Sequence, residues 1–340
     1  MRERIVTPDK YSEEDERQII TLRPKSLSEY IGQARAVNKL KISINAALQR
    51  GEPHEHMLLY GPPGLGKTTL AHILAHEMGT KIIVSSGPSL QRMGDLMGIL
   101  TNLEEGDILL IDEVHRLAPS VEEFIYPAME DFKVDFVVDK GAFARVINVP
   151  LKKFSLVGAT TRAGLLTAPL RDRFGIVHHI DFYPPEELAD IVRRSAGILN
   201  IDLANEAAII IAQRSRGTPR VANRLLRRVR DYCQVNGIDR VNSQSVLDSL
   251  KMEGIDSAGL DDLDRRLITT MVNYYKGGPV GIESIAATLN EEVDTLIEMI
   301  EPFLLKIGFL KRTRRGRVVG DAAFKHLKLP RDEGAQSELL

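Results

Sequence analysis

The stretch that decides the fold is Gly61-Pro62-Pro63-Gly64-Leu65-Gly66-Lys67-Thr68, which fits the phosphate-loop pattern G-x-x-x-x-G-K-[ST]. The apolar run at 56–60 before it has the length of a strand, and apolar residues at 69–78 recur at helical spacing. Between a strand and a helix, the loop amides and the helix N-terminus would point at one anion. We therefore predict a phosphate site, because this context disfavours a chance Gly/Pro-rich turn that happens to end in Lys-Thr.

The chemistry of such a loop predicts further ligands downstream. Lys67 would place a charge on the β- and γ-phosphates, and Thr68 would offer a hydroxyl to Mg²⁺. Residues 107–113 read as a buried strand that ends in two carboxylates. Asp112 then lies at the carboxyl end of a strand, where it can hold Mg²⁺ through water, and Glu113 can polarise a water that attacks the γ-phosphate. The alternative is a pair of solvated turn acids.

Composition bounds the class of protein. At 340 residues the chain is long enough for two or three domains, and its net charge of −2 means that any nucleic-acid surface must be local. Cys233 is the single cysteine, which excludes an intramolecular disulfide and a cysteine-based zinc site and indicates a reducing, cytoplasmic setting. No apolar run approaches the ~18 residues of a membrane span, so we expect no membrane partner.

The first half of the chain predicts an α/β fold. Strands at 81–84, 107–113, 154–161 and 176–180 alternate with helices, which indicates a parallel sheet. The helix before the phosphate loop carries Val37, Leu40, Ile44 and Leu48 on one face. Residues 132–149 have the form of a β-hairpin around Asp139-Lys140-Gly141. Its strands are more apolar than an exposed ribbon requires, so it either packs on its own domain or serves as a docking surface.

The second half changes character after Pro184-Pro185. Residues 186–250 show only helical periodicity and predict a small all-helical domain. The acidic, Gly-containing stretch 253–264 reads as a solvated linker that runs into an acidic helix start. Three helices and a short hairpin around Gly316 then have the layout of a winged helix. We divide the chain into a flexible arm (1–18), a large phosphate-loop domain (19–183), a small helical domain (184–255), a winged helix (256–330) and a flexible tail (331–340).

Two arginine segments and two histidines are further candidates. Arg173 and Arg220 could each enter a γ-phosphate site, where a guanidinium supplies planar donors to transition-state charge. Pro219 presets a helical first turn, which would project Arg220 toward the nucleotide. The alternative is that both arginines form ordinary surface ion pairs. His72 and His76 are four residues apart, but Ile73 stands where a zinc protease needs glutamate.

The charge pattern near the C-terminus favours DNA. Residues 306–328 contain eight Lys or Arg against one Asp, and such a patch offers contacts to phosphates. A protein unfoldase would carry an aromatic pore loop, yet residues 81–106 contain no Phe, Tyr or Trp. A two-lobed helicase, suggested by Asp112-Glu113-Val114-His115, would need a second sheet-forming half. A nucleotide-gated DNA switch would read bases, whereas Arg312 to Arg317 suit backbone contact.

Together these motifs resemble the AAA+ ATPases, and most closely the RuvB family of bacterial Holliday-junction branch-migration motors. The resemblance runs from Leu22 to about Leu329 and rests on stretches such as GPPGLGKTTLA, IDEVHRL, GATTRAGLLTAPLRDRFGI, GTPRVANRLLRRVRD and GFLKRTRRGR. It implies an AAA+ parallel-sheet domain, a helical lid and a winged helix, with ATP and Mg²⁺ as cofactors. It further implies a homohexamer that translocates duplex DNA at Holliday junctions in recombination and repair. Another AAA+ DNA-remodelling switch, such as a clamp loader or initiator, is the alternative.

The resemblance also implies roles for individual residues. The nucleotide would lie against Leu22, Arg23, Gly64, Leu65, Gly66, Lys67, Thr68, Thr69, Tyr183 and Arg220, with Thr68 and Asp112 serving Mg²⁺. Glu113 is then the catalytic carboxylate, Thr160 the γ-phosphate sensor and Arg173 the finger given to a neighbouring subunit.

Partner contacts are implied in the same way. Glu130, Asp131 and Phe132 match a nucleotide-side motif that has tyrosine or a similar residue third. The hairpin at 132–149 corresponds to the docking element for the junction-binding protein RuvA, which would link the motor indirectly to the RuvC resolvase. The DNA-contacting arginines of the wing would be Arg312, Arg314, Arg315 and Arg317, of which Arg314 departs from relatives that carry proline.

Overall fold

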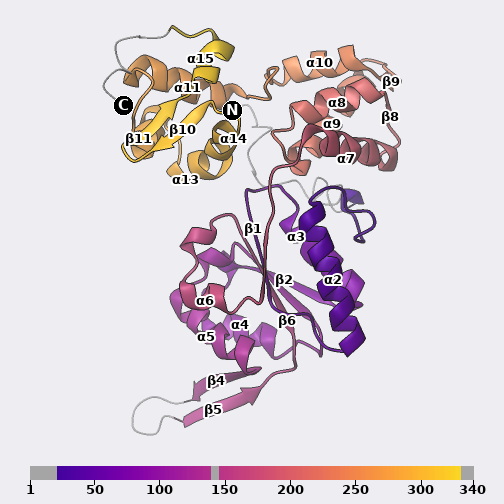
Figure 1. Cartoon of the computed structure of the whole chain (residues 1–340), viewed down its shortest axis with the longest axis vertical. Coiled ribbons are helices and arrows are strands. Elements are labelled where there is room, and N and C mark those ends of the chain that lie inside the picture. Colours follow the sequence, from indigo (N-terminus) through magenta and orange to yellow (C-terminus); the bar gives the residue numbers. More distant parts are fainter. Residues whose placement is uncertain (1–20, 139–144, 331–340) are drawn as a thin grey trace. The chain divides into compact units, whose positions relative to one another are not determined.

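The computed structural model of the chain describes residues 21–138 and 145–330. It divides into two compact units (Figure 1), one formed by Arg23–Asp181 and the other by Leu22 together with the chain from Phe182 onward. Each unit has its own core. Among the described residues, no helix is both long enough and apolar enough to cross a membrane.

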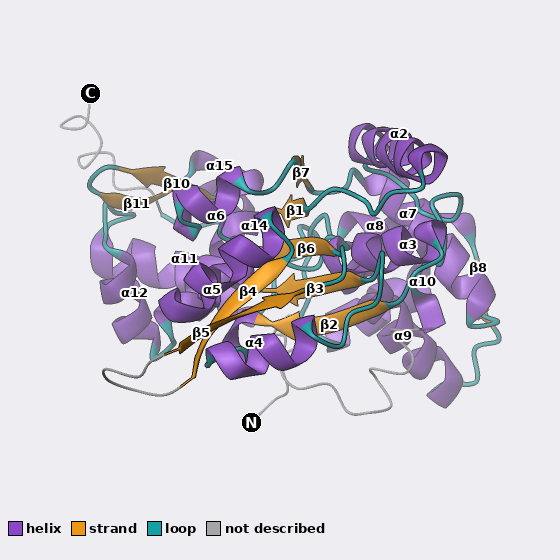
Figure 2. Ribbon diagram, turned by 90° about the horizontal axis from the view of Figure 1, so that it is seen from below, coloured by secondary structure: helices purple, strands orange, loops and turns teal. Residues whose placement is uncertain are grey.

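A five-stranded parallel sheet in the order β2-β3-β6-β1-β7 forms the centre of the first unit (Figure 2). Its strands are β1 (Met57–Tyr60), β2 (Ile82–Ser86), β3 (Ile108–Asp112), β6 (Ser155–Thr160) and β7 (Ile176–His179). The side chains of β6 are all buried, and so are those of β3 up to Asp112. Continuous apolar runs of this kind are typical of strands covered on both faces, so the predicted parallel sheet is confirmed.

Helices cover both faces of this sheet (Figure 1), with α2 and α3 on one side and α4, α5 and α6 on the other. Their bounds are α2 (Ala34–Arg50), α3 (Lys67–Met78), α4 (Met93–Leu100), α5 (Pro119–Glu130) and α6 (Ala168–Asp172), with short 3-10 turns η1 (Gly87–Ser89), η2 (Val114–Arg116) and η3 (Ala163–Leu165). The predicted face of α2 is partly wrong. Leu48 is exposed, and Ala47 takes the buried position because Ala47 lies eleven positions after the buried Ala36, which is about three helical turns.

The predicted hairpin is present as β4 (Lys133–Val138) paired antiparallel with β5 (Arg145–Pro150), while its expected turn, Asp139-Lys140-Gly141, lies outside the described residues. At the base, Val134 is fully buried and Val149 packs against the core of the first unit. Farther along β5, Ile147 is exposed. The base of the hairpin therefore packs on its own unit, and an apolar side chain remains exposed beyond it.

The second unit begins with a mainly helical part. Its helices are α7 (Pro185–Ile198), α8 (Asn205–Gln213), α9 (Pro219–Val235) and α10 (Ser243–Met252). The prediction of an all-helical domain is incomplete, because β8 (Asp202–Leu203) and β9 (Arg240–Val241) form a short parallel pair. Strands of two residues are too short to show a sequence period. Cys233 is a buried residue of α9.

The rest of this unit has the predicted winged-helix order. It comprises α11 (Asp262–Tyr275), α12 (Ile282–Leu289), α13 (Val293–Thr295), the π-helical turn η4 (Leu296–Ile300), α14 (Glu301–Lys306), β10 (Leu310–Thr313), β11 (Gly316–Val319) and α15 (Asp321–Leu327). The predicted third helix is thus interrupted by a π turn, and α15 was not predicted. Strands β10 and β11 pair antiparallel and form the wing.

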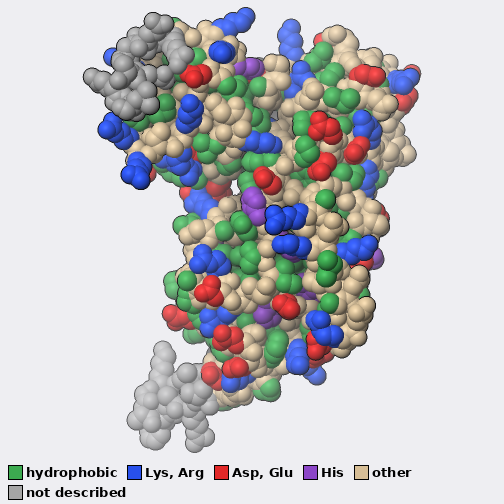
Figure 3. Space-filling model, in the orientation of Figure 1, with side chains coloured by type: hydrophobic (Ala, Val, Ile, Leu, Met, Phe, Trp, Pro, Cys, Tyr) green, Lys and Arg blue, Asp and Glu red, His purple; other side chains and the backbone are tan. Residues whose placement is uncertain are grey.

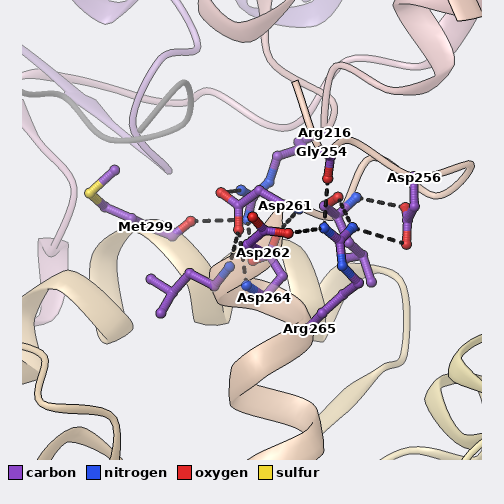
Figure 4. A network of polar contacts seen from close by, with 10 residues as sticks. Arg216, Gly254, Asp256, Asp261, Asp262, Asp264, Arg265 and Met299 are labelled. Carbon is purple, nitrogen blue, oxygen red and sulfur yellow. Dashed lines mark hydrogen bonds and ion pairs between the residues drawn. The ribbon is translucent and has the colours of Figure 1, made fainter. Parts of the chain in front are cut away.

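The acidic stretch 253–264 runs into an acidic helix start, as predicted, because Asp261 caps α11 and Asp262 and Asp264 lie in its first turn. The stretch is not, however, solvated throughout as its composition predicts. Asp264 is fully buried, and the buried Arg216 donates to it at 3.0 Å and to the carbonyl of Met299 at 3.3 Å (Figure 4). The guanidinium of Arg216 also lies 4.8 Å from the centre of the Phe303 ring. Burial raises the pKa of Asp264 to about 7, although Arg216 opposes the rise. The physical reason for the error is this cation, which lies 48 residues away in the sequence.

A buried histidine links three elements of the first unit. The backbone N–H of Leu156 donates to Nδ1 of His56 at 2.8 Å, and Nε2 of His56 donates to the carbonyl of Met129 at 3.0 Å. Both contacts together require the neutral ring, because a protonated Nδ1 cannot accept a hydrogen bond. Burial lowers the pKa of His56 below its usual value.

We therefore expect the stability of the first unit to fall as the pH drops below about 6.5, since the unfolded state then binds a proton more readily than the folded state. Between the unfolded and folded pKa values, His56 should contribute a slope of up to ~1.4 kcal/mol per pH unit. Chemical denaturation of wild type and of His56→Gln from pH 8 to pH 5.5 measures this slope. The variant should be less stable at pH 8 but less sensitive to acid, and an unchanged slope would contradict the assignment.

Candidate active site

The carboxyl ends of three adjacent strands bring the phosphate loop, Asp112, Glu113 and Thr160 to one edge of the sheet, whereas Arg173 lies before the amino end of β7. Tyr60 of β1 lies in register with Thr160 of β6, and the N–H of Gly61 donates to the carbonyl of Thr160 at 3.2 Å. On the other side of β6, β3 ends at Asp112. Because β6 lies between β1 and β3, Thr160 stands between the phosphate loop and the carboxylates.

The path of the phosphate loop depends on glycine. Gly61, Gly64 and Gly66 all have positive φ angles, of 147°, 78° and 93°. A Cβ atom on Gly61 would lie 2.0 Å from the carbonyl oxygen of Ile180, so no other residue fits there without moving the backbone. A Cβ atom on Gly66 would lie 3.1 Å from the hydroxyl of Tyr30. Tyr30 therefore lies over the end of the loop.

Lys67 begins α3 and turns back over its own loop. Its Nζ donates to the carbonyls of Gly61 and Pro62, each at 2.8 Å, and the residue is buried. The first amides of a helix have no partner within the helix. The start of α3 therefore combines backbone N–H groups with a lysine cation, which is the donor set that phosphate oxygens require.

The predicted metal ligands are in direct contact. The hydroxyl of Thr68 donates to Oδ2 of Asp112 at 3.1 Å, and the backbone N–H of Glu113 donates to Oδ1 of Asp112 at 2.9 Å. A hydroxyl and one carboxylate suit Mg²⁺, which binds through few protein oxygens and completes its shell with water and phosphates. Among the described residues, no cluster of three or more His, Cys, Asp or Glu side chains could hold a metal by itself.

Glu113 has the exposed carboxylate expected of a base but holds it against a cation. The φ angle of Glu113 is 49°. Its Oε2 atom pairs with Nη1 of Arg116 at 2.9 Å. Both side chains are well exposed. An ion pair at the surface contributes at most ~1 kcal/mol, so the carboxylate can leave Arg116 at little cost. Arg116 was not among the predicted site residues, because a charged residue three positions after another is a common pattern.

Thr160 is linked to the turn that follows Glu113. Its hydroxyl lies 2.8 Å from Nδ1 of His115 and accepts a hydrogen bond from the backbone N–H of Arg162 at 3.0 Å. Burial lowers the pKa of His115, so the ring is neutral near pH 7. His115 entered the sequence-based prediction only as part of a helicase-like box. Its position two residues after Glu113, beyond the end of a buried strand, was the available signal.

Arg173 follows α6 and contacts α5 of its own unit. Its guanidinium carbon lies 4.2 Å from the centre of the Tyr126 ring, and Nη2 pairs with Glu130 at 3.1 Å. The side chain is 22% exposed, so it projects outward less than the sequence suggested. Of the other predicted nucleotide-side residues, Asp131 pairs with Lys133 at 3.0 Å. The Phe132 ring lies against the rings of His56 and Phe154.

The remaining predicted nucleotide contacts belong to the second unit or to its boundary. Leu22 and Arg23 fall on either side of the division between the units. Tyr183 is buried, and its N–H donates to the carbonyl of Gly217 at 2.9 Å. Arg220 is an exposed residue in the first turn of α9. Thr218 caps this helix, because its side chain accepts a hydrogen bond from the N–H of Val221. Pro219 occupies the first helical position, as predicted.

The wing presents two kinds of arginine. Arg312 and Arg317 are cross-strand neighbours, and both donate to Glu301, at 2.6 Å from Nη2 of Arg312 and 2.9 Å from Nε of Arg317. Glu301 is 1% exposed and Arg317 only 16%. Burial alone would raise the pKa of Glu301, but the hydrogen bonds from the two arginines outweigh it and lower the pKa.

Arg314 and Arg315 differ, because they are exposed at the turn between the strands. Figure 3 shows Lys and Arg side chains gathered on the surface over β10 and β11. Part of the charge counted from the sequence is therefore neutralised inside the winged helix, since Glu301 lies just outside the counted segment. The exposed part of the basic patch is smaller than the sequence indicated.

Three sequence models of protein families match successive parts of the chain. They are the Holliday junction DNA helicase RuvB P-loop domain at residues 22–180, the RuvB AAA lid domain at 183–256 and the RuvB C-terminal winged helix domain at 257–328. The chain belongs to the RuvB family. It is accordingly an AAA+ P-loop ATPase with a lid and a C-terminal winged helix, and the resemblance noted in the sequence is confirmed.

Individual RuvB proteins match over nearly their whole length. The chain is 53% identical over 334 residues to the Holliday junction branch migration complex subunit RuvB of Kosmotoga olearia, covering 98% of this chain and 97% of that one. It is 54% identical over 322 residues to the protein of the same name from Desulfosudis oleivorans, covering 95% and 94%. The solved Thermotoga maritima RuvB Holliday junction branch migration motor matches with a TM-score of 0.85 at 50% identity, covering 92% of this chain and 100% of that one.

Proposed function

We propose that this protein is an ATP-driven motor that moves duplex DNA through Holliday junctions during recombination and repair. The observation that carries the proposal is the meeting of the phosphate loop, Asp112, Glu113 and Thr160 at one sheet edge in a chain that also has a winged helix. The relatives named above as branch migration complex subunits support extending that activity to this chain. A DNA substrate also favours a cytoplasmic location.

In the proposed reaction each loop residue exchanges a protein contact for a nucleotide contact. Lys67 leaves the carbonyls of Gly61 and Pro62 and binds β- and γ-phosphate oxygens. Thr68 and Asp112 hold Mg²⁺, which when bound neutralises charge that develops on the phosphates. Glu113 leaves Arg116 and orients the attacking water, whose proton it accepts. Thr160 donates its hydroxyl hydrogen to the γ-phosphate.

The rest of the proposed nucleotide site comes from the residues that the family resemblance implies. Gly64 to Thr69 wrap the phosphates, Leu22 and Arg23 border the base, and Tyr183 and Arg220 contribute from the lid. Glu130 to Phe132 and Arg173 would serve the nucleotide of a neighbouring subunit in a homohexamer. The support within this chain is that Glu130 and Arg173 contact each other, so they can act at one interface.

We propose two partner surfaces. Arg312, Arg314, Arg315 and, to a lesser degree, Arg317 contact DNA phosphates, which the exposure of the first three supports. The hairpin at 132–149 docks RuvA, for which the exposed Ile147 is the support, and RuvC is reached indirectly through that complex. The predicted division into an arm, three domains and a tail is retained as part of this proposal.

Glu113→Gln should bind ATP with nearly wild-type affinity but hydrolyse it at least ~100-fold more slowly, because the amide cannot take the proton from water while Lys67 and Asp112 stay in place. Nucleotide binding by fluorescence, phosphate release and migration of a synthetic four-way junction measure the three steps. Arg116→Gln is the matched control, since it frees the carboxylate without removing it. Wild-type junction migration by Glu113→Gln would overturn the proposed role.

Mixing two inactive variants tests action across subunits. Lys67→Ala and Arg173→Ala should each hydrolyse little ATP, yet a mixture creates interfaces with an intact loop on one side and an intact arginine on the other. Because an arginine finger contributes ~10³–10⁵ in rate, even a minority of repaired interfaces should exceed both parents clearly. The measurement is steady-state ATPase after subunit exchange. Titrating wild type into each variant controls for a need for consecutive active sites, and a mixture as inactive as its parents would argue against a shared site.

The two kinds of wing arginine should separate by mutation. Replacing Arg314 and Arg315 with Ala should weaken the binding of duplex DNA of any sequence. The slope of log binding constant against log salt concentration should fall in magnitude by about 2. The free energy of unfolding should change by less than ~0.5 kcal/mol. Arg317→Ala should instead lower the stability of the winged helix by about 1–3 kcal/mol, because it leaves buried Glu301 short of a partner. Thermal unfolding and DNA titrations at several salt concentrations distinguish them. A normal melting temperature for Arg317→Ala would contradict the structural role.

A further inference from the structure

One face of α5 carries three functional side chains at intervals of four residues, Glu122, Tyr126 and Glu130. Residues four apart on a helix lie one above the other. The hydroxyl of Tyr126 donates to Oε1 of Glu122 at 2.6 Å, and the hydroxyl of Thr167 donates to the same oxygen. Glu122 is buried, so one carboxylate oxygen gives the hydroxyls of Tyr126 and of the exposed Thr167 a common, fixed acceptor.

This fixed point is tied to the segment that carries Arg173. Thr167 caps α6 by accepting from the N–H of Leu170, and Arg173 follows the last residue of that helix. The guanidinium of Arg173 stacks over the Tyr126 ring at 4.2 Å, and its Nη1 donates to the carbonyl of Pro169 at 2.8 Å. The arginine and the ring beneath it are therefore positioned by one network that joins α5 to α6.

The contacts of Arg173 differ in how readily a ligand could replace them. Glu130 is an exposed partner, and such pairs are weak and screened. Among the described residues, Nε of Arg173 is buried without a hydrogen-bond partner. The Tyr126 ring contacts the face of the guanidinium and leaves its edge clear of the ring, and on that edge the Nη2 contact with exposed Glu130 is the one that a phosphate oxygen can replace.

We propose that Tyr126 is a positioning residue that holds the plane of Arg173 for the nucleotide of a neighbouring subunit. This inference rests on the proposed action of Arg173 across the subunit interface. When that nucleotide arrives, its γ-phosphate replaces the carboxylate of Glu130 on the guanidinium edge. The Tyr126 ring stays in place. Because it already restricts the rotamers of the Arg173 side chain, that side chain loses less conformational entropy when the nucleotide binds. Glu122 and Thr167 act one step further away by fixing the tyrosine.

The mixture of Lys67→Ala and Arg173→Ala proteins tests this inference, because the expected result depends on which of the two subunits carries a substitution of Tyr126. In that mixture the Lys67→Ala subunit donates its arginine, and the Arg173→Ala subunit holds the nucleotide. Tyr126→Leu is placed either in the donor, as Lys67→Ala with Tyr126→Leu, or in the acceptor, as Arg173→Ala with Tyr126→Leu. Each is mixed with the unchanged complementary variant, and ATPase is measured after subunit exchange.

We expect Tyr126→Leu in the donor to lower the recovered rate by about 2- to 30-fold, the size of one lost cation–π contact. The same change in the acceptor should leave the recovered rate within about 2-fold of the unmodified mixture. Tyr126→Phe in the donor keeps the ring and loses only the hydroxyl, so it should lie closer to the unmodified mixture than Tyr126→Leu does. Tyr274→Leu in the donor is the matched control, since Tyr274 is an exposed residue of α11.

The remaining outcomes overturn the inference in distinguishable ways. Equal losses from donor and acceptor would mean that Tyr126 only stabilises the fold, and no loss from either would mean that the ring does not position Arg173. Equal effects of Phe and Leu in the donor would assign the effect to the hydroxyl instead of the ring. If the unmodified mixture itself recovers no activity, it is the proposed action across subunits that fails.

Discussion

The structure of the candidate site depends on one close approach of backbone to backbone. At the end of β1 the chain turns so tightly past Ile180 that a Cβ atom on Gly61 would lie 2.0 Å from its carbonyl oxygen. The same turn lets the N–H of Gly61 bond to the carbonyl of Thr160. The phosphate loop is therefore anchored to both strands that flank β1, and its position relative to Thr160 and Asp112 follows from the sheet order. Glycine here is required by space as well as by φ.

Charged groups of the proposed site are held by contacts that a ligand can replace, at the phosphate-loop edge and at the pair formed by Arg173 and Glu130. Lys67 bonds to carbonyls of its own loop, Glu113 pairs with Arg116, and Arg173 pairs with Glu130. In each of the two ion pairs at least one of the two side chains is well exposed, and exposed pairs contribute little to the free energy of folding. Each side chain is thus kept near its working position without a large energy to overcome. Preorganisation of this kind reduces the ordering that the nucleotide must impose.

Much of the first unit could be predicted from sequence because its signals are local. A strand, a glycine-rich loop and a helix follow one another directly between Met57 and Met78. The contact between Thr68 and Asp112 could be anticipated because Thr68 ends the phosphate-loop motif and Asp112 ends a buried strand. The rest depended on partners that are distant in sequence. The acids near 253–264 look solvated unless Arg216 is known to be buried beside Asp264. His115, Arg116 and Tyr126 were missed because each is an ordinary residue type whose partner only the fold supplies.

The second unit shows why charge counts along a sequence misjudge a surface. Arg216 and Glu301 are both almost completely buried, and each has its own partner of opposite charge. Such partners are needed because a buried charge without one strongly destabilises the fold. Glu301 takes the hydrogen bonds of Arg312 and Arg317 before any DNA is present. A phosphate that approaches the wing therefore meets the exposed charges of Lys311, Arg314 and Arg315, while Arg312 can contribute only the donors that Glu301 leaves unused. The buried carboxylate thus sets how rigid the wing is and how much of its charge faces outward.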